Sequence, residues 1–180
     1  MPVLLVQHGV DEAVFDKNKY AIRPVDGVIV SASGRNSRNK GFGHIENAAR
    51  KSGVSMLTAQ YGGGKLSKDQ MPDFYSKASV HVCFSKNEGL SNPVLEAGAM
   101  GLVPISTRCG AAEEMIRDGE NGFLIDRNVH ELADRFNQLK DDNLRQSMAD
   151  RFYEEIMEKW TWKVKIEEYR NMFKEFLSNA

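Results

Sequence analysis

Two glutamates on either side of a turn of small residues are the side chains in this sequence best placed to do chemistry. Glu88 and Glu96 lie eight positions apart and flank the turn Gly89-Leu90-Ser91-Asn92. Pro93 follows Asn92, a pattern that predicts an N-cap at Asn92 and a helix beginning at Pro93. Backbone N–H groups at a helix start lie at the positive end of the helix dipole. They would bind a phosphate or another anion, while the carboxylates accept hydrogen bonds from sugar hydroxyls.

Short apolar runs alternate with helical patterns on both sides of this turn. The runs that predict buried strands are Gly27–Ser33, Val54–Gln60, Val80–Ser85, Val103–Thr107 and Gly122–Ile125. Apolar residues at helical spacing lie between them and continue in three further segments after Asn128. Strands that alternate with helices are typical of βαβ units. We therefore expect an α/β fold, with a Rossmann-like parallel sheet of about five or six strands flanked by helices.

The composition of the whole chain narrows the class of protein. Its 180 residues are enough for one domain with a sizeable core. Lysine and arginine (24) nearly balance aspartate and glutamate (25), so the net charge of −1 gives no overall attraction to nucleic acid or acidic membranes. No apolar run reaches membrane-spanning length. Cys83 and Cys109 lack metal-ligand spacing, and we expect reduced thiols in a cytoplasmic protein.

The passage from Phe84 to Gly122 resembles the donor-site half of retaining GT-B glycosyltransferases of the group 1 type. Their pattern is roughly PS-x-x-EG-F-x4-LEA-x3-G-x-PV-x2-T-x-x-GG-x-x-E-x-I-x-x-G-x-NG, and this chain has FSKNEGLSNPVLEAGAMGLVPISTRCGAAEEMIRDGENG. Gly34-Arg35 and Lys40-Gly41 match the family's GR-x4-KG signature, and His8–Phe15 resembles its interdomain segment. The resemblance implies a connection at residues 1–15, a nucleotide-sugar-binding domain with C-terminal helices at 16–180, and a longer protein of which this is the C-terminal half.

The resemblance also implies roles for individual residues. Breaking a sugar–phosphate bond leaves charge on the diphosphate, and Arg35 and Lys40 match the family's diphosphate-binding cations. Glu96 matches the glutamate that holds the ribose, and Glu88 matches the one that faces the donor sugar. Arg35, Lys40 and Glu88 are therefore the candidate catalytic residues. The candidate donor-binding residues are Glu96 and, through the backbone, Gly34, Gly89, Leu90, Ser91 and Asn92.

These roles imply a nucleotide sugar, such as a UDP- or GDP-hexose, as the small-molecule partner, with no cofactor and no metal ion. Transfer to a hydroxyl acceptor would need the missing N-terminal domain, and we expect this chain alone to be nearly inactive. Membrane contact would come only through that missing half, and no nucleic-acid partner is expected. Capsule, lipopolysaccharide and glycolipid assembly all remain open as pathways.

The sequence departs from the family pattern in several places. Phe84 replaces a proline, Leu90 a phenylalanine, Ala111 the second glycine and Glu113 a proline. These changes leave the predicted phosphate site intact but obscure which sugar is held. A non-catalytic nucleotide-sugar-binding or regulatory subunit of GT-B type is the alternative function, and a GT-B epimerase is a third.

Overall fold

The computed structural model describes residues 6–20, 27–34, 39–60 and 66–178. At its centre, five parallel strands form a sheet in the order β2-β1-β3-β4-β5. Along the chain the strands are β1 (Ile29–Gly34), β2 (Ser55–Gln60), β3 (Val80–Cys83), β4 (Val103–Thr107) and β5 (Phe123–Ile125). This architecture confirms the predicted α/β fold with a Rossmann-like parallel sheet.

The central strands are buried on both faces, as their apolar sequences predict. Val30 of β1 pairs with Val80 of β3, which in turn pairs with Val103 of β4, and all three side chains are fully buried. Strands covered on both faces need such continuous apolar runs, and β-branched side chains pack well on a pleated surface. Because the strands are parallel, their carboxyl ends meet at the same edge of the sheet.

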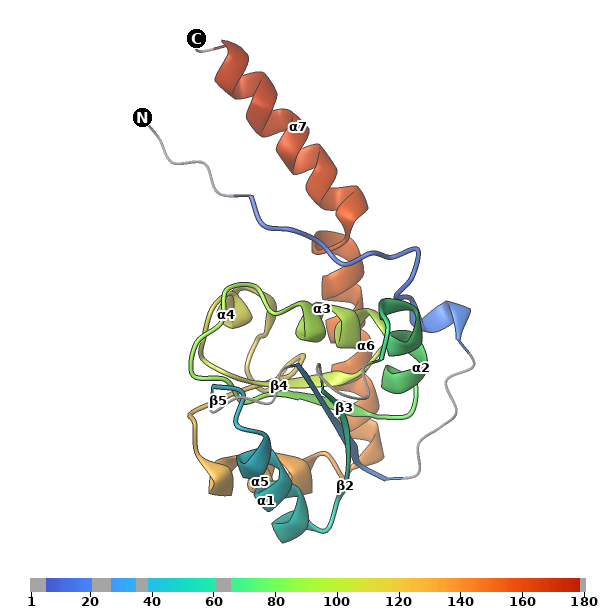
Figure 1. Ribbon diagram of the computed structural model, residues 1–180, viewed down its shortest axis with the longest axis vertical. Coiled ribbons are helices and arrows are strands. Elements are labelled where there is room, and N and C mark those ends of the chain that lie inside the picture. The colour runs from blue at the N-terminus through green and yellow to red at the C-terminus, as the bar shows by residue number, and fades with distance from the viewer. Residues whose placement is uncertain (1–5, 21–26, 35–38, 61–65, 179–180) are drawn as a thin grey trace.

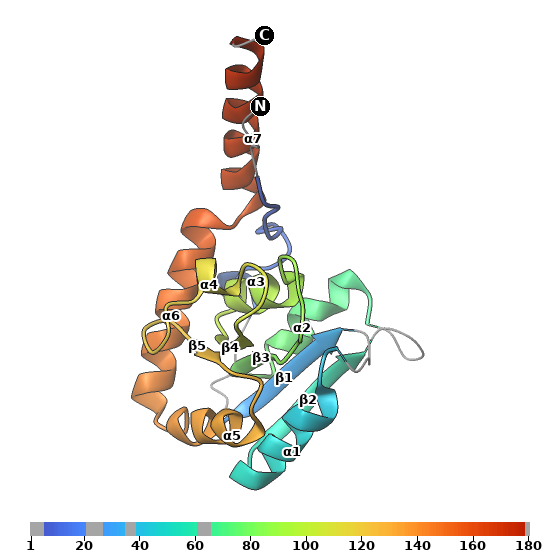
Figure 2. The same cartoon turned by 90° about the vertical axis from the view of Figure 1, so that its left-hand side faces the viewer.

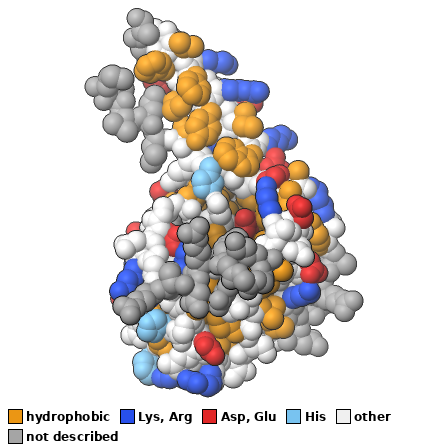
Figure 3. Space-filling view, viewed as in Figure 1, with side chains coloured by type: hydrophobic (Ala, Val, Ile, Leu, Met, Phe, Trp, Pro, Cys, Tyr) orange, Lys and Arg blue, Asp and Glu red, His pale blue; other side chains and the backbone are white. Residues whose placement is uncertain are grey.

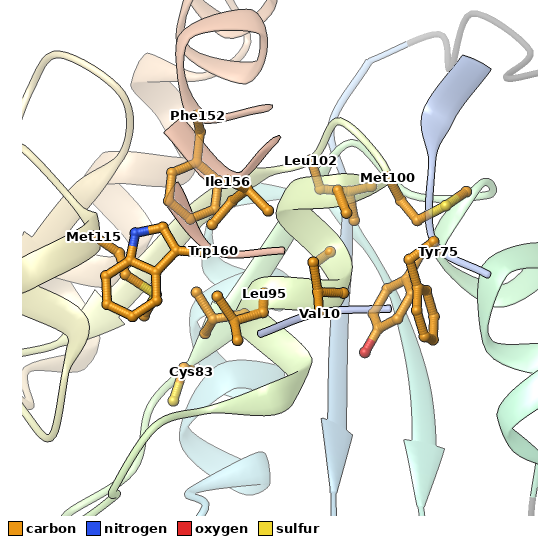
Figure 4. Packing of buried hydrophobic residues seen from close by; sticks show 14 of the residues in the cluster. Val10, Tyr75, Cys83, Leu95, Met100, Leu102, Met115, Phe152, Ile156 and Trp160 are labelled. Atoms are coloured by element: carbon orange, nitrogen blue, oxygen red, sulfur yellow. The ribbon is translucent and has the colours of Figure 1, made fainter. Parts of the chain in front are cut away.

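Helices cover both faces of the sheet (Figures 1 and 2). Along the chain they are α1 (Phe42–Ser52), α2 (Met71–Tyr75), α3 (Asn92–Ala99), α4 (Ala112–Met115), α5 (Val129–Gln138), α6 (Asp142–Lys159) and α7 (Trp162–Ser178), with short 3₁₀ helices η1 (Lys17–Lys19) and η2 (Lys68–Gln70). One core lies between the sheet and the pair α1 and α5. A second core joins α2, α3 and α6 to the other face, and Figure 4 shows part of its packing.

The start of α3 differs by one residue from the sequence prediction. The N-cap is Ser91, which has an extended backbone (φ −82°, ψ 100°), and Asn92 is already helical. The carbonyl oxygen of Ser91 accepts hydrogen bonds from the N–H groups of Val94 and Leu95, so the helical pattern begins there. The prediction of an N-cap at Asn92 is therefore wrong. Pro93 still falls in the first two helical positions, where its missing N–H carries no cost.

The N-terminal segment is bonded to the junction between α6 and α7. The N–H of Val10 donates to the carbonyl oxygen of Trp160 at 2.7 Å, and the N–H of Trp162 donates to the carbonyl oxygen of Val10 at 2.9 Å. Gly9 lies so close to this junction that a Cβ atom there would be 2.4 Å from the carbonyl carbon of Thr161. Glycine is thus required for the close approach of these two backbones.

Helix α7 extends away from the body of the molecule, and the segment that begins at Val6 runs beside its start (Figures 1 and 2). The hydroxyl of Tyr169 donates to the carbonyl oxygen of Val6 at 3.1 Å, which ties the two together. Among the residues the structure describes, none of the helices has the length and apolar character needed to span a bilayer. Both cysteines are free, with Cys83 buried and Cys109 partly exposed.

Candidate functional site

The candidate residues gather at the carboxyl edge of the sheet. Gly34 ends β1, Lys40 precedes α1, Glu88 lies in the loop between β3 and α3, and Glu96 lies on α3. Ligands of open parallel sheets bind in the crevice at this edge, where loops and helix starts converge. Arg35, the other predicted catalytic cation, lies outside the described residues.

Lys40 and Glu88 form a direct ion pair. The Nζ atom of Lys40 donates to Oε1 of Glu88 at 2.6 Å, and the two side chains are 21% and 15% exposed. Gly34 makes room for the lysine, since a Cβ atom there would lie 3.3 Å from Cε of Lys40. An ammonium group has three donors, so Lys40 can hold Glu88 and still bind a phosphate oxygen. The pair therefore combines a cation for an anion with a carboxylate for hydroxyl groups.

The loop that carries Glu88 is held from two sides. On one side Oδ1 of Asn39 accepts from the N–H groups of Lys86 (3.2 Å) and Asn87 (3.1 Å), and Nδ2 of Asn39 donates to the carbonyl oxygen of Asn87 at 3.0 Å. On the other side the backbone of Gly110 lies directly against the loop. Gly110 has φ +57°, and a Cβ atom there would lie 1.9 Å from the carbonyl oxygen of Gly89, so only glycine fits. This clamped loop fixes where Glu88 and the following backbone amides lie.

Glu96 has a different environment from Glu88. Its Oε2 atom accepts a hydrogen bond from the hydroxyl of Tyr75 at 3.0 Å. Burial raises the pKa of Glu96 to about 7, while the hydrogen bond from Tyr75 and the positive charge of Lys68 act in the opposite direction. Near neutral pH the Glu96 side chain is therefore divided between its charged and neutral forms.

A cavity of about 330 Å³ opens beside Glu96. Its wall comes from the N-terminal segment, η2, α3 and the start of α7, and the lining residues are His8, Gly9, Val10, Asp11, Phe15, Lys68, Asn92, Leu95, Glu96 and Trp162. Lys40 and Glu88 are not among them. The structure thus brings Lys40 and Glu88 into contact, and it places Glu96 in a separate cavity together with Asn92 of the same turn.

The remaining turn residues serve the packing of this region as well. Leu90 packs against the core cluster between α3 and the sheet, and Ser91 is buried. The carbonyl oxygen of Gly89 accepts a hydrogen bond from the N–H of Ala111 at 3.0 Å. The substitution of alanine for the family's second glycine at position 111 therefore leaves this contact in place.

Sequence reasoning missed two residues that support the site. Asn39 holds the loop before α3, and Tyr75 holds Glu96. Tyr75 is fully buried, and its ring packs against that of His81, 5.7 Å between centroids. Burial and then the charge of Lys40 lower the pKa of His81 to about 3, so this histidine is neutral at physiological pH. Asn39 ends the polar segment 35–39, which indicates a loop in the sequence. No pattern in the sequence indicates a role for the hydroxyl of Tyr75.

Solved glycosyltransferase structures share this arrangement of sheet and helices. Sucrose-phosphate synthase from Thermosynechococcus elongatus matches with a TM-score of 0.83 at 17% identity, over 98% of this chain and 53% of that one. HepE from Anabaena, in a crystal structure with UDP, matches with a TM-score of 0.76 at 14% identity, over 94% of this chain and 57% of that one. At such identities the likeness defines the fold, which is the Rossmann-like C-terminal half of the GT-B class.

The chain belongs to the family of glycosyl transferases group 1, whose model matches residues 44–158. The lipopolysaccharide core biosynthesis glycosyltransferase LpsE of Rhizobium meliloti (strain 1021) is 31% identical, over 74% of this chain and 46% of that protein. The chain therefore spans about half the length of this relative and of the two matched structures. The resemblance drawn from the sequence is confirmed for both fold and family.

Proposed function

We propose that this chain is the donor-binding half of a retaining glycosyltransferase that moves a hexose from a nucleotide sugar to a hydroxyl acceptor. The observation that carries the proposal is the ion pair of Lys40 with Glu88 in the loop before α3, with Glu96 on that same helix and lining the neighbouring cavity. Two relatives support it, since LpsE is described as a glycosyltransferase and HepE was solved with UDP.

Each residue has a defined task in this proposal. Arg35 and Lys40 neutralise the charge that develops on the diphosphate as the bond to the sugar breaks, so the reaction needs no metal ion or cofactor. Glu88 accepts hydrogen bonds from the donor sugar, and Glu96 accepts them from the ribose hydroxyls. Backbone amides of the turn 89–92, together with Gly34, line the path between sugar and phosphates.

Exposed apolar side chains on α7 support the proposal that the whole protein has a second domain. The large hydrophobic side chains that are exposed in the described part of the chain all lie on this helix: Trp162, Ile166, Phe173, Phe176 and Leu177. Figure 3 shows hydrophobic side chains along the extended end of the molecule that α7 forms. Contiguous exposed apolar surface marks an interaction site. In our proposal an N-terminal acceptor-binding domain covers this surface, and residues 1–15 connect it to the domain formed by residues 16–180.

Calorimetric titration with UDP, GDP and ADP tests the donor site. We expect one of these nucleotides to bind this chain, and Arg35→Ala to weaken that binding about tenfold or more because a phosphate ligand is lost. Arg50→Ala is the matched control, since Arg50 is exposed on α1 and its guanidinium group donates a hydrogen bond to the neighbouring Asn47. The donor-site assignment is contradicted if neither this chain nor a longer protein that contains both halves binds any of the three at millimolar concentration.

Transfer assays separate the proposed enzyme from the non-catalytic alternative. We expect this chain alone to transfer no sugar, because the acceptor-binding residues would lie in the other half. A longer protein with both halves is expected to form a product that keeps the anomeric configuration of the donor, which NMR of the product reads directly. Nucleotide-sugar binding without transfer by the longer protein would favour a regulatory subunit instead.

A further inference from the structure

Tyr75 is a buried aromatic residue whose ring and hydroxyl do different things. The side chain has no exposed surface, and its ring packs edge-on against Phe15, Phe74 and His81 with centroid distances of 6.3, 5.3 and 5.7 Å. A phenylalanine would make the same ring contacts. The hydroxyl group therefore needs a reason of its own, because burying it costs free energy unless it is hydrogen-bonded.

The hydroxyl of Tyr75 joins the first strand of the sheet to α3. It lies 3.1 Å from Oγ of Ser33, the residue before Gly34 at the end of β1, and 3.0 Å from Oε2 of Glu96. A charged carboxylate can only accept a hydrogen bond. When Glu96 is ionised, Tyr75 must therefore donate its single proton to Glu96 and accept from Ser33. The three side chains form one directed chain of hydrogen bonds that ends on Glu96.

We propose that Tyr75 is a positioning residue of the nucleotide site, which fixes one oxygen of Glu96 and favours its charged form so that the carboxylate can accept from the two ribose hydroxyls. The inference rests on the proposed function, in which Glu96 binds the ribose. A carboxylate held by one donor has its rotamer fixed before the ligand arrives, and less conformational entropy is lost on binding.

Other charged and titratable groups also face Glu96. Lys68 of η2 and His8 and Asp11 of the N-terminal segment line the same cavity, and Nζ of Lys68 pairs with Oδ2 of Asp11 at 3.0 Å. His81 lies against the ring of Tyr75 and is neutral at physiological pH. Lys68 acts on Glu96 through its charge, whereas Tyr75 donates a hydrogen bond to it. The Tyr75→Phe substitution removes the hydroxyl group and keeps these four residues in the sequence.

The Tyr75→Phe variant tests the inference through the pH dependence of UDP binding. Loss of the hydrogen bond is expected to raise the pH at which Glu96 ionises by about one unit, since hydrogen bonds to charged groups are the stronger ones. We expect calorimetry to show UDP binding weakened about fivefold near pH 7, where the ionised fraction of Glu96 falls from about one half to about one tenth, and restored towards the parent affinity near pH 9. A purely structural role would weaken binding by the same factor at every pH. Tyr153→Phe is the matched control, because its hydroxyl contacts Asp16 and Asn18 instead.

A second measurement keeps the role of Tyr75 testable without any nucleotide. An NMR titration of the Glu96 side-chain carbon, assigned with the Glu96→Gln variant, should show a higher pKa for Glu96 in Tyr75→Phe than in the parent. If the parent protein binds none of UDP, GDP and ADP, the proposed function is in question, while this titration still decides whether Tyr75 favours the charged form of Glu96; if it binds GDP or ADP instead, that nucleotide replaces UDP in the affinity test. An unchanged pKa of Glu96, or the same loss of UDP affinity at pH 7 and pH 9, would overturn the inference.

Discussion

The Glu96→Gln variant is expected to unfold at a higher temperature than the parent protein at pH 8, and to bind nucleotide more weakly. Burial raises the pKa of Glu96 from its ordinary 4.5 to about 7. Between these values the folded protein keeps a proton that the unfolded chain has lost, so the free energy of unfolding falls as the pH rises. Above pH 7 the full cost of the buried charge is present. Glutamine is neutral, has nearly the same shape and can still accept from Tyr75.

The size of this effect follows from the change in the pKa of Glu96. A rise from 4.5 to about 7 corresponds to roughly 3 kcal/mol of stability at alkaline pH, or a melting temperature higher by about 6–12 °C in a domain of this size. Circular dichroism melts at pH 4.5 and pH 8 measure it, with Glu46→Gln on the exposed face of α1 as the control. We expect the two proteins to converge at pH 4.5. A difference of the same size at both pH values would mean that Glu96 carries no such buried charge.

The Lys40→Met variant is expected to lose about a hundredfold or more in turnover, measured in a longer protein that contains both halves. The substitution removes the cation at the departing diphosphate. It also leaves the carboxylate of Glu88 without the ammonium that now lies 2.6 Å away. Both changes add negative potential where negative charge develops, so nucleotide binding should weaken as well. Methionine retains much of the side-chain length, which separates the loss of charge from a loss of packing.

Two further variants sharpen this result. In the double variant Lys40→Met with Glu88→Gln, nucleotide affinity should recover in part, because the unpaired carboxylate is gone, while turnover stays low. Lys51→Met, on an exposed position of α1, is the matched control for the loss of one positive charge. Turnover of Lys40→Met equal to that of the control would refute a role for Lys40 at the diphosphate.

The sequence was sufficient to predict the sheet and the position of the loop between β3 and α3, which carries Glu88. Apolar runs such as Val80–Cys83 and Val103–Thr107 indicate buried strands when helical patterns separate them, and parallel strands then bring their carboxyl ends together. Because Lys40 follows β1 and Glu88 follows β3, this geometry predicts that both residues lie at the carboxyl edge of the sheet. The helix start was predicted one residue late, because Ser91 and Asn92 are both good N-caps and only the backbone angles of Ser91 decide between them.

The surroundings of Glu96 could not be predicted in the same way. Its hydrogen bond from Tyr75 depends on how α2 packs against α3, and the spacing of apolar residues carries no information about a single hydroxyl group. The cavity beside it is formed by residues far apart in the sequence, such as His8 and Trp162, which tertiary packing brings together. Local patterns specify elements, whereas a site built between elements depends on their relative orientation.

The backbone of Val10 is hydrogen-bonded to both Trp160 and Trp162, so the N-terminal segment is fixed to the junction between α6 and α7. His8 and Trp162 lie close to this junction in the sequence, and both line the cavity beside Glu96. Helix α7 has 17 residues and begins at this junction. Because Val10 is hydrogen-bonded on both sides of this junction, we expect a change in the tilt of α7 to move both His8 and Trp162 and so to alter the shape of the cavity.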